Sequence, residues 1–211
     1  MIAALPAALR LIVILDRDAA GARDLAAIGA AAERGGATML QVRAKGLAAG
    51  DLVALVRRVM EATRLPVVVN DRLDVALAAD AAGCHLGQDD LPPAVARRLA
   101  PPGFLLGGSA NDVAEARRAA EGGVHYLGVG PIKVTGNKPD AGTPIGADGL
   151  RRVVAAGAPP AVAIGGVGAA DVPALAAAGA VGVAVIGAVL SADDPERAAR
   201  LLRAALDRAL P

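Results

Sequence analysis

The chain has 211 residues, 55% of them hydrophobic, with one Phe, one Tyr and no Trp. Its 22 basic and 21 acidic residues leave a formal charge of +1, which is too balanced for a nucleic-acid-binding surface or a membrane-surface patch. The single cysteine, Cys84, excludes an internal disulfide. It is expected to be a core residue and fits a reducing, cytoplasmic compartment. We expect no secretory signal, because the first residues, MIAALPAAL, carry no charge.

The same unit recurs along the chain: an apolar run of strand length followed by a helical segment. Strands are predicted at 10–15, 37–42, 66–70, 83–86, 104–107, 124–129, 160–164 and 181–186. Helices are predicted near 22–34, 50–63, 73–80, 92–99, 111–120, 148–156, 169–178 and 195–208. Expected helix-capping residues are Asp51, Asn111, Asp148, Asp171 and the DDP at 193–195.

The uncharged stretch 172–192 is long enough to cross a bilayer. Pro173 and Gly179 interrupt it, however, so a helix, a glycine turn and the strand at 181–186 are predicted instead. Continuous apolar strands that alternate with helices indicate a parallel sheet covered on both faces. Eight such units fill the chain and predict an α/β fold with one domain over 1–211, a closed (β/α)₈ TIM barrel, whereas an open doubly wound sheet would more often use five or six strands.

Two short motifs, VVVND at 67–71 and HLGQDD at 85–90, each read as a buried strand ending in amide and carboxylate groups. Their last residues, Asp71 and Asp90, are 90 − 71 = 19 positions apart, the length of one strand–helix–strand step. Neighbouring parallel strands would therefore deliver both carboxylates to the same rim. Such a pair suits Mg²⁺, which takes one or two protein carboxylates and completes its shell with water and phosphate. The alternative is that each aspartate caps the following helix.

Barrel enzymes act at the carboxyl ends of their strands, and this chain collects its polar and glycine residues there. Glycines after strands 7 and 8 would let backbone N–H groups approach a phosphate. The residues at this rim are Gln41, Arg43, Lys45, Asn70, Asp71, Gln88, Asp89, Asp90, Ser109, Thr135, Asn137, Lys138, Gly165, Gly166, Ile186 and Gly187.

Simpler interpretations of these residues remain open. Arg43, Lys45 and Lys138 could be solvated loop charges, the pair Gly165–Gly166 could only make a tight turn, and Ser109 could only introduce a helix. The two histidines and the tyrosine are predicted to serve packing: His85 and His125 as core or second-layer residues, and Tyr126 as a core residue.

The chain resembles the thiamine-phosphate synthase family over essentially its whole length. The order and spacing of eight short matches carry the resemblance: QVRAK at 41–45, VVVND at 67–71, HLGQDD at 85–90, GGS at 107–109, GVGPI at 128–132, Lys138, AIGG at 163–166 and VI at 185–186. The family joins a hydroxymethylpyrimidine diphosphate to a hydroxyethylthiazole phosphate and releases pyrophosphate. The resemblance thus implies a transferase of thiamine biosynthesis with small-molecule substrates, no nucleic-acid or membrane partner, and a quaternary structure that could be a homo-oligomer.

The resemblance also implies residue roles. The pyrimidine diphosphate would be bound by Gln41, Arg43, Lys45, Asn70, Ser109 and Lys138, of which Arg43, Lys45, Ser109 and Lys138 would be catalytic. The thiazole phosphate would be surrounded by Thr135, Asn137, Gly166, Ile186 and Gly187. Asp71 and Asp90 would hold Mg²⁺ against the diphosphate. No protein nucleophile is needed, because the aminopyrimidine ring can stabilise a methylene cation after the C–O bond breaks.

Four positions depart from the family pattern: Ala44 stands in place of Glu, Val134 of Pro, Asn137 of Thr and Gly187 of Ser. Three of them fall on the acceptor half of the site, so the acceptor is left open at this point. Two alternatives are a thiazole tautomerase, whose catalytic His would stand where this chain has Pro131, and a non-catalytic phosphate-binding barrel. The retained Asp71 and Asp90 argue against both.

Overall fold

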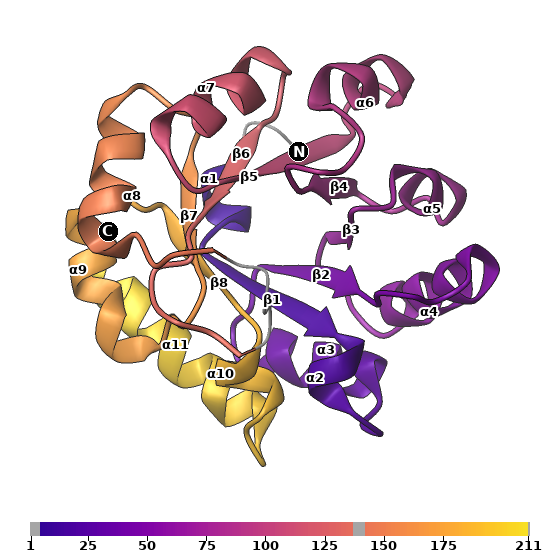
Figure 1. The fold of residues 1–211 in the computed structure, drawn as a ribbon. Helices are drawn as coiled ribbons and strands as arrows, with labels where there is room; N and C mark the ends of the chain where they lie inside the picture. The colour runs from indigo at the N-terminus through magenta and orange to yellow at the C-terminus, as the bar shows by residue number, and fades with distance from the viewer. Residues whose placement is uncertain (1–4, 137–141, 211) are drawn as a thin grey trace.

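The structure is a computed structural model that describes residues 5–136 and 142–210. Eight parallel strands close into a barrel in chain order, from β1 to β8 and back to β1, as predicted (Figure 1). The strands are β1 (Leu11–Asp16), β2 (Met39–Arg43), β3 (Val67–Asn70), β4 (Gly83–Leu86), β5 (Leu105–Ala110), β6 (Tyr126–Val129), β7 (Ala161–Ile164) and β8 (Gly182–Val185).

A ring of helices surrounds the strands. The predicted ones are α3 (Leu25–Arg34), α4 (Ala49–Glu61), α5 (Leu73–Ala78), α6 (Pro93–Leu99), α7 (Val113–Glu121), α8 (Gly146–Ala155), α9 (Val172–Ala177) after the short 3₁₀ turn η2 (Ala169–Asp171), and α11 (Pro195–Ala209). Three four-residue helices were not predicted: α1 (Leu5–Ala8), α2 (Arg17–Ala20) and α10 (Gly187–Leu190). A single helical turn is too short to leave a periodic apolar pattern in the sequence.

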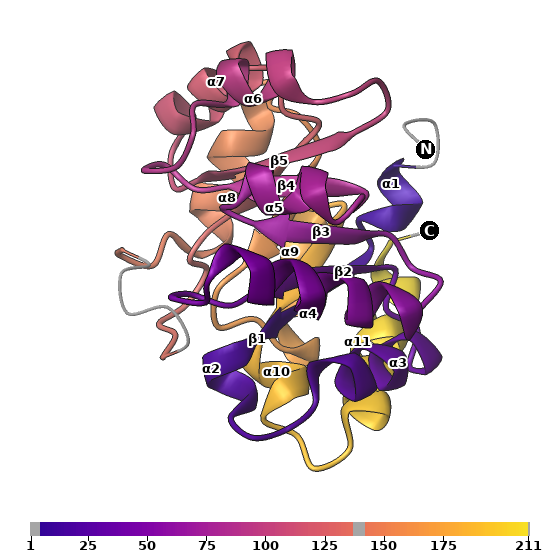
Figure 2. The ribbon, with the colours of Figure 1, turned by 90° about the vertical axis from the view of Figure 1, so that its right-hand side faces the viewer.

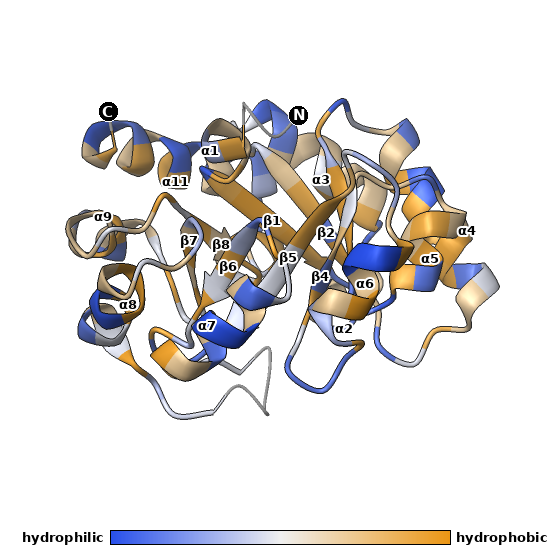
Figure 3. Cartoon of the chain, turned by 90° about the horizontal axis from the view of Figure 1, so that it is seen from above, coloured by the Kyte–Doolittle hydropathy of each residue, from blue (hydrophilic) through white to orange (hydrophobic). Residues whose placement is uncertain are grey.

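The apolar residues divide into two layers, because successive strand residues point to opposite faces of the sheet. One layer lies between strands and helices and consists mainly of Val, Leu, Ile and Ala side chains, including the buried Cys84. The other fills the barrel interior with Leu5, Leu9, Ile12, Ile14, Met39, Val68, Leu105, Tyr126, Val162 and Ala184. Apolar colour accordingly runs along much of the strands, and the helices show both apolar and polar colour (Figure 3).

Helix α1 closes the barrel at the amino ends of the strands (Figure 2). Its Leu5 and the following Leu9 are buried in the interior layer. The Thr38 hydroxyl donates to the carbonyl of Ala8 at 2.9 Å, which links this segment to the start of β2. This end is therefore filled, and the space open to ligands lies at the opposite, carboxyl end.

The capping predictions were only partly correct. Asp194 caps α11 by accepting from the Arg197 N–H at 2.9 Å, as predicted. The predictions for Asp51, Asn111 and Asp148 were wrong, because the helices begin one to three residues away from the predicted starts: α4 follows Ala48, α7 is capped by Asp112 and α8 follows Ile145. Local sequence could not choose between the neighbours Asn111 and Asp112 for α7, and α4 and α8 begin without a side-chain cap. Asp171 occupies the N-cap position of α9 as predicted but makes no side-chain capping bond to that helix.

Within the part of the chain that the structure describes, no helix is both long and apolar enough to cross a bilayer. The uncharged stretch 172–192 instead contains α9, β8 and α10, as the positions of Pro173 and Gly179 predicted apart from the extra short helix.

Candidate active site

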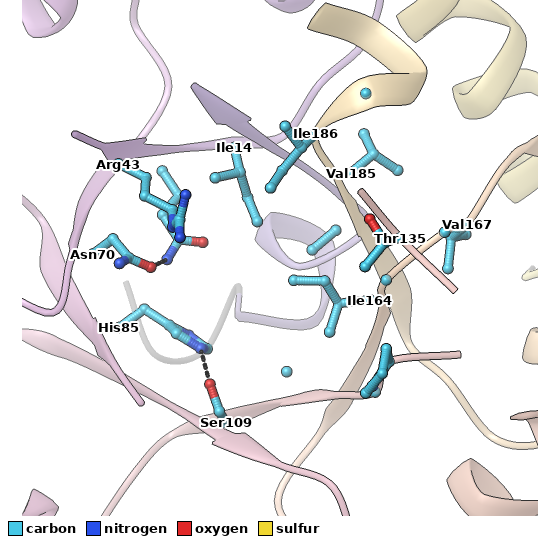
Figure 4. A pocket seen from close by; sticks show the side chains of 18 of the residues that line it. Ile14, Arg43, Asn70, His85, Ser109, Thr135, Ile164, Val167, Val185 and Ile186 are labelled. Atoms are coloured by element: carbon cyan, nitrogen blue, oxygen red, sulfur yellow. Dashed lines mark hydrogen bonds between the residues drawn. The ribbon is translucent and has the colours of Figure 1, made fainter. Parts of the chain in front are cut away.

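A cavity of about 650 Å³ lies at the carboxyl ends of the strands. It brings together every described residue to which the sequence assigned a site role: Gln41, Arg43, Lys45, Asn70, Asp71, Asp90, Ser109, Thr135, Gly166, Ile186 and Gly187. Asn137 and Lys138 lie outside the described residues. Figure 4 shows Arg43, Asn70, His85 and Ser109 on one side of the cavity and Ile164, Val167 and Ile186 on the other. The cavity thus has a polar half and a more apolar half.

Asp71 and Asp90 meet in the polar half. Asp71 follows β3 with a positive φ of 64°, a conformation that costs a non-glycine residue energy and recurs at functional sites. Its N–H donates to the His85 carbonyl at 2.8 Å, which ties the turn to β4. Burial raises the pKa of Asp71, contact with Asp90 raises it further, and Arg43 and Lys45 oppose the shift, giving about 6. The two carboxylates therefore repel each other unless a proton or cation lies between them.

The prediction that these aspartates could be helix caps is wrong. Helix α5 has Arg72 at its N-cap position and α6 has Pro92, and neither receives a side-chain capping bond. The Asp90 carboxylate instead accepts from the Gly87 N–H at 2.6 Å, inside its own loop. No group of three or more His, Cys, Asp or Glu among the described residues could enclose a metal. Two carboxylates facing an open cavity fit Mg²⁺, which keeps several water or phosphate ligands.

Arg43 is part of β2 and is 8% exposed, so the prediction of a solvated loop charge is wrong for it. Its Nη1 pairs with the carboxylate of Asp16, which is also buried. No role was predicted for Asp16 from the sequence. Lys45 lies two residues further on, is exposed, and lines the cavity.

Amide groups from adjacent strands form the next contact. Gln41 in β2 donates through Nε2 to Oδ1 of Asn70 in β3 at 2.9 Å. Gln41 is paired with Val68 in the strand register, two residues before Asn70, so the two side chains share the inner face of the barrel. The contact fixes the orientation of both amides toward the cavity.

His85 joins Ser109 to the barrel interior. Its Nε2 lies 3.2 Å from Ser109 Oγ (Figure 4). Its Nδ1 lies 3.2 Å from the Tyr126 hydroxyl. Burial raises the pKa of Tyr126, so this hydroxyl keeps its proton. The packing prediction for His85 was thus incomplete, because the buried ring also lines the cavity. Ser109 lies inside β5, and Asp112 introduces the next helix, so Ser109 is not a helix-entry residue.

Glycines make room for the contacting side chains of Ser109, His85 and Tyr126. A Cβ on Gly107 would lie 2.4 Å from Tyr126 Cζ and 2.5 Å from His85 Nδ1, and a Cβ on Gly128 would lie 3.1 Å from His85 Cε1. Glycines inside β5 and β6 were the sequence signal for a bulky inward group on a neighbouring strand. His125 lies at the opposite end of β6, where its Nδ1 accepts from the Leu106 N–H at 2.9 Å, in agreement with its predicted packing role.

The loop after β7 forms the wall of the apolar half. Gly165 and Gly166 have positive φ angles of 90° and 67°, so they do make a tight turn, and both line the cavity. A Cβ on Gly166 would lie 2.8 Å from the Val134 carbonyl oxygen and 2.9 Å from Lys133 Cβ. Lys133, which sequence reasoning missed, pairs with Asp171 at 2.7 Å. Asp171 also accepts from the Gly168 N–H at 2.9 Å and so fastens the loops after β6 and β7 together.

The fold and the cavity define the class: a (β/α)₈-barrel enzyme with carboxylates, cations and glycine turns gathered at one rim. A family model described as thiamine monophosphate synthase matches residues 11–189, so the chain belongs to the thiamine monophosphate synthase family.

Relatives agree with this assignment over nearly the whole chain. Thiamine-phosphate synthases of Roseiflexus sp. (strain RS-1) and Moorella thermoacetica are 47% and 48% identical to it. Each alignment covers 94% of this chain, and 85% and 96% of the respective relative. The solved thiamine phosphate pyrophosphorylase of Pyrococcus furiosus is 35% identical with a TM-score of 0.90, and the match covers 98% of this chain and 100% of that one. The family resemblance predicted from the motifs is confirmed.

Proposed function

We propose that this chain is a thiamine-phosphate synthase that joins 4-amino-2-methyl-5-hydroxymethylpyrimidine diphosphate to hydroxyethylthiazole phosphate and releases pyrophosphate. It is a transferase of thiamine biosynthesis, as its family and relatives are. The observation that carries the proposal is the single cavity in which the described residues with predicted roles meet. Its polar half suits a diphosphate with a metal, and its other half suits a small ring with a phosphate tail.

The diphosphate substrate is assigned to the polar half. Arg43 and Lys45 would neutralise the negative charge that grows on the diphosphate as it departs, with Ser109 donating a hydrogen bond and Lys138 adding a further cation. The Gln41–Asn70 pair would hold the pyrimidine ring through its amide groups. A group that binds growing charge more tightly than ground-state charge accelerates the reaction, which is the role expected of these residues.

Asp71 and Asp90 are the proposed Mg²⁺ ligands. Their mutual contact and the raised pKa of Asp71 support this assignment, because they indicate a site that favours an added positive charge. Bound there, Mg²⁺ would supply positive charge beside the diphosphate and make it a better leaving group.

The thiazole phosphate is assigned to the apolar half, near Thr135, Gly166, Ile186 and Gly187. The family resemblance assigns Asn137 to the same ligand, and this residue lies outside the described part of the chain. The positive-φ turn at Gly165–Gly166 supports a close approach of backbone N–H groups to a phosphate. Ile164 and Ile186 would pack against the thiazole ring. The thiazole nitrogen would then be held facing the pyrimidine methylene carbon, and such positioning removes much of the entropic cost of a bimolecular reaction.

The chemistry needs no protein nucleophile. The C–O bond between the methylene carbon and the diphosphate breaks with its electron pair moving to oxygen, and the aminopyrimidine ring stabilises the resulting cation. The thiazole nitrogen then donates its lone pair to the methylene carbon and forms the C–N bond. A tautomerase would need an acid or base at position 131, where this chain has a proline that lines the cavity. That alternative has no support in the site.

The test is to incubate the protein with both substrates and Mg²⁺ and to measure pyrophosphate and thiamine phosphate. Equal amounts of the two products are expected, and activity should disappear in EDTA. Asp71→Ala should lower the rate by ~10²–10³, the usual loss when one transition-state charge contact is removed. Asp74→Ala is the matched control, because Asp74 is an exposed carboxylate paired with Arg72 outside the cavity. Wild-type turnover by Asp71→Ala would contradict the assignment of Asp71 as a metal ligand. If the wild-type protein forms no thiamine phosphate, the proposed function is wrong.

A further inference from the structure

Asp16 lies next to the active-site cavity without lining it. It is the last residue of β1, and its side chain is 3% exposed. Its two carboxylate oxygens have different partners. Oδ1 accepts from the Ala19 N–H at 2.9 Å and caps α2, whereas Oδ2 pairs with Nη1 of Arg43. The register of the barrel places Asp16 directly opposite Arg43 on the neighbouring strand.

The position of Arg43 depends on this contact. A guanidinium keeps its charge under all ordinary conditions and has five N–H donors, so a partner on one nitrogen leaves the others for a ligand. A cation that is 8% exposed also needs a counter-charge. The carboxylates that line the cavity together with Arg43 are Asp71, Asp89, Asp90 and Asp171. Without Asp16, the proposed metal ligands Asp71 and Asp90 become available in the same cavity as counter-charges for the guanidinium.

We propose that Asp16 is a positioning residue: it holds the Arg43 guanidinium toward the diphosphate and keeps it from pairing with Asp71 and Asp90. The inference rests on the proposed function, since it takes the ligands of this half of the cavity to be a diphosphate and Mg²⁺. Asp16 itself touches neither, so its effect on turnover passes through Arg43.

The main variant is Asp16→Asn, whose amide oxygen can still cap α2 while the counter-charge to Arg43 is lost. Turnover should fall by about 10- to 100-fold, the range found when a partner that orients a ligand-binding group is removed. The Mg²⁺ concentration for half-maximal rate should rise several-fold, because Arg43 then competes with the metal for Asp71. A purely structural role would lower the melting temperature without moving the Mg²⁺ requirement.

A double variant keeps the test valid if the buried, unpaired arginine impairs folding. Arg43→Gln combined with Asp16→Asn leaves two neutral side chains that can bond each other. On the Arg43→Gln background, Asp16→Asn should cause no further loss of rate and should raise the melting temperature. A further tenfold loss of rate on that background would show that Asp16 acts independently of Arg43 and would overturn the proposal.

The matched control is Asp24→Asn. Asp24 also caps a helix, accepting from the Ala26 N–H at 3.0 Å, and also pairs with an arginine, Arg58, at 2.8 Å. Both of these side chains are exposed and neither lines the active-site cavity, so rate and Mg²⁺ requirement should stay at wild-type values.

Calorimetry with Mg²⁺ and inorganic pyrophosphate separates this inference from the proposed function. A wild-type protein that binds Mg²⁺–pyrophosphate but forms no thiamine phosphate would overturn the proposed reaction, and weaker binding by Asp16→Asn would still support the positioning role. An Asp16→Asn protein that binds Mg²⁺–pyrophosphate and turns over as the wild type does would overturn the role of Asp16 alone.

Discussion

At the scale of single residues, Asp71 gives the cavity a characteristic pH dependence. With metal removed by EDTA, its pKa is about 6 in the folded protein, against 3.8 for the ordinary side chain. The folded state therefore holds this proton more tightly than the unfolded state does. The contribution of this proton to the free energy of unfolding is fully present below pH 4 and is lost as the pH rises through about 6. Asp71→Asn should remove this contribution, which denaturant unfolding at pH 4 to 7 would measure.

Asp74 provides a control, because its contribution to stability changes with pH in the opposite direction. Its hydrogen bond with Arg72 lowers the pKa of Asp74, so its contribution is present above the ordinary value and is lost as the pH falls. Asp74→Asn should therefore flatten the acid side of the profile and leave the Asp71 effect in place. If Asp71→Asn and the wild type keep a constant difference in unfolding free energy across this range, the environment assigned to Asp71 is wrong.

The acceptor half gives a second prediction at this scale. The family resemblance implies that Gly187 and Asn137 take positions where hydroxyl residues are expected, and Asn137 lies outside the described residues. Gly187→Ser with Asn137→Thr should add hydrogen bonds to the thiazole phosphate, each worth roughly 1.5–3 kcal/mol if well aligned. The KM for the thiazole phosphate should fall at least about tenfold, since 1.4 kcal/mol is a factor of ten. The KM for the pyrimidine diphosphate should stay nearly constant.

Steady-state kinetics with each substrate varied in turn measures this, with Gly50→Ser as the control. Gly50 lies on α4 with open space around its Cβ position and outside the cavity. A double variant that uses the thiazole phosphate less well would indicate that Gly187 and Asn137 are adapted to another acceptor.

At the scale of elements, the caps decide where helices start and how firmly they are held. Asp194 caps α11, the longest helix, which packs against α3 and α9. Asp194→Ala should lower the free energy of unfolding by ~1 kcal/mol, the usual value of such a cap. Turnover should be unchanged, because α11 contributes no residue to the cavity.

Asp193→Ala is the control, since this neighbouring carboxylate is exposed and does not cap the helix. Its effect should stay within about 0.5 kcal/mol, as for most surface substitutions. Equal losses of stability in the two variants would mean that local charge, rather than the cap, stabilises the start of α11.

At the scale of the whole molecule, the two ends of the barrel serve different purposes. Leu9 is fully buried where α1 closes the barrel, and no residue of α1 lines the cavity. Leu9→Ala should lower the free energy of unfolding by about 2–5 kcal/mol, because it leaves a void among the interior side chains. The kcat at 25 °C should stay near that of the wild type.

Leu201→Ala is the comparison, since Leu201 is 59% exposed on α11 and its loss should be nearly neutral. Denaturant titration gives the stability and a pyrophosphate assay gives the rate. A large loss of kcat in folded Leu9→Ala would show that the filled end is coupled to the active end.

The sequence by itself determined the fold class and most of the site. Eight apolar runs with helices between them predicted a parallel barrel rather than an open sheet, and a barrel of parallel strands places all its carboxyl ends at one rim. Asp71, Asp90, Arg43 and Ser109 could therefore be assigned to one cavity from their positions after or near the ends of strands. Motif order then separated this family from other barrels, because single matches of one to six residues are common and eight in this order and spacing are not.

Only the tertiary structure decided which partner each of these residues has. Asp16 and Arg43 are 27 residues apart in the chain, and His85 and Tyr126 are 41 apart. Strand register brings each pair together, and no local pattern encodes it. The same holds for Asp71 and Asp90. They matched the pattern of a helix cap, yet they cap no helix and line the cavity instead. The local sequence decides which chemical groups are available. Long-range packing decides the charges and hydrogen bonds around each group, because these depend on neighbouring residues that closure of the barrel brings close.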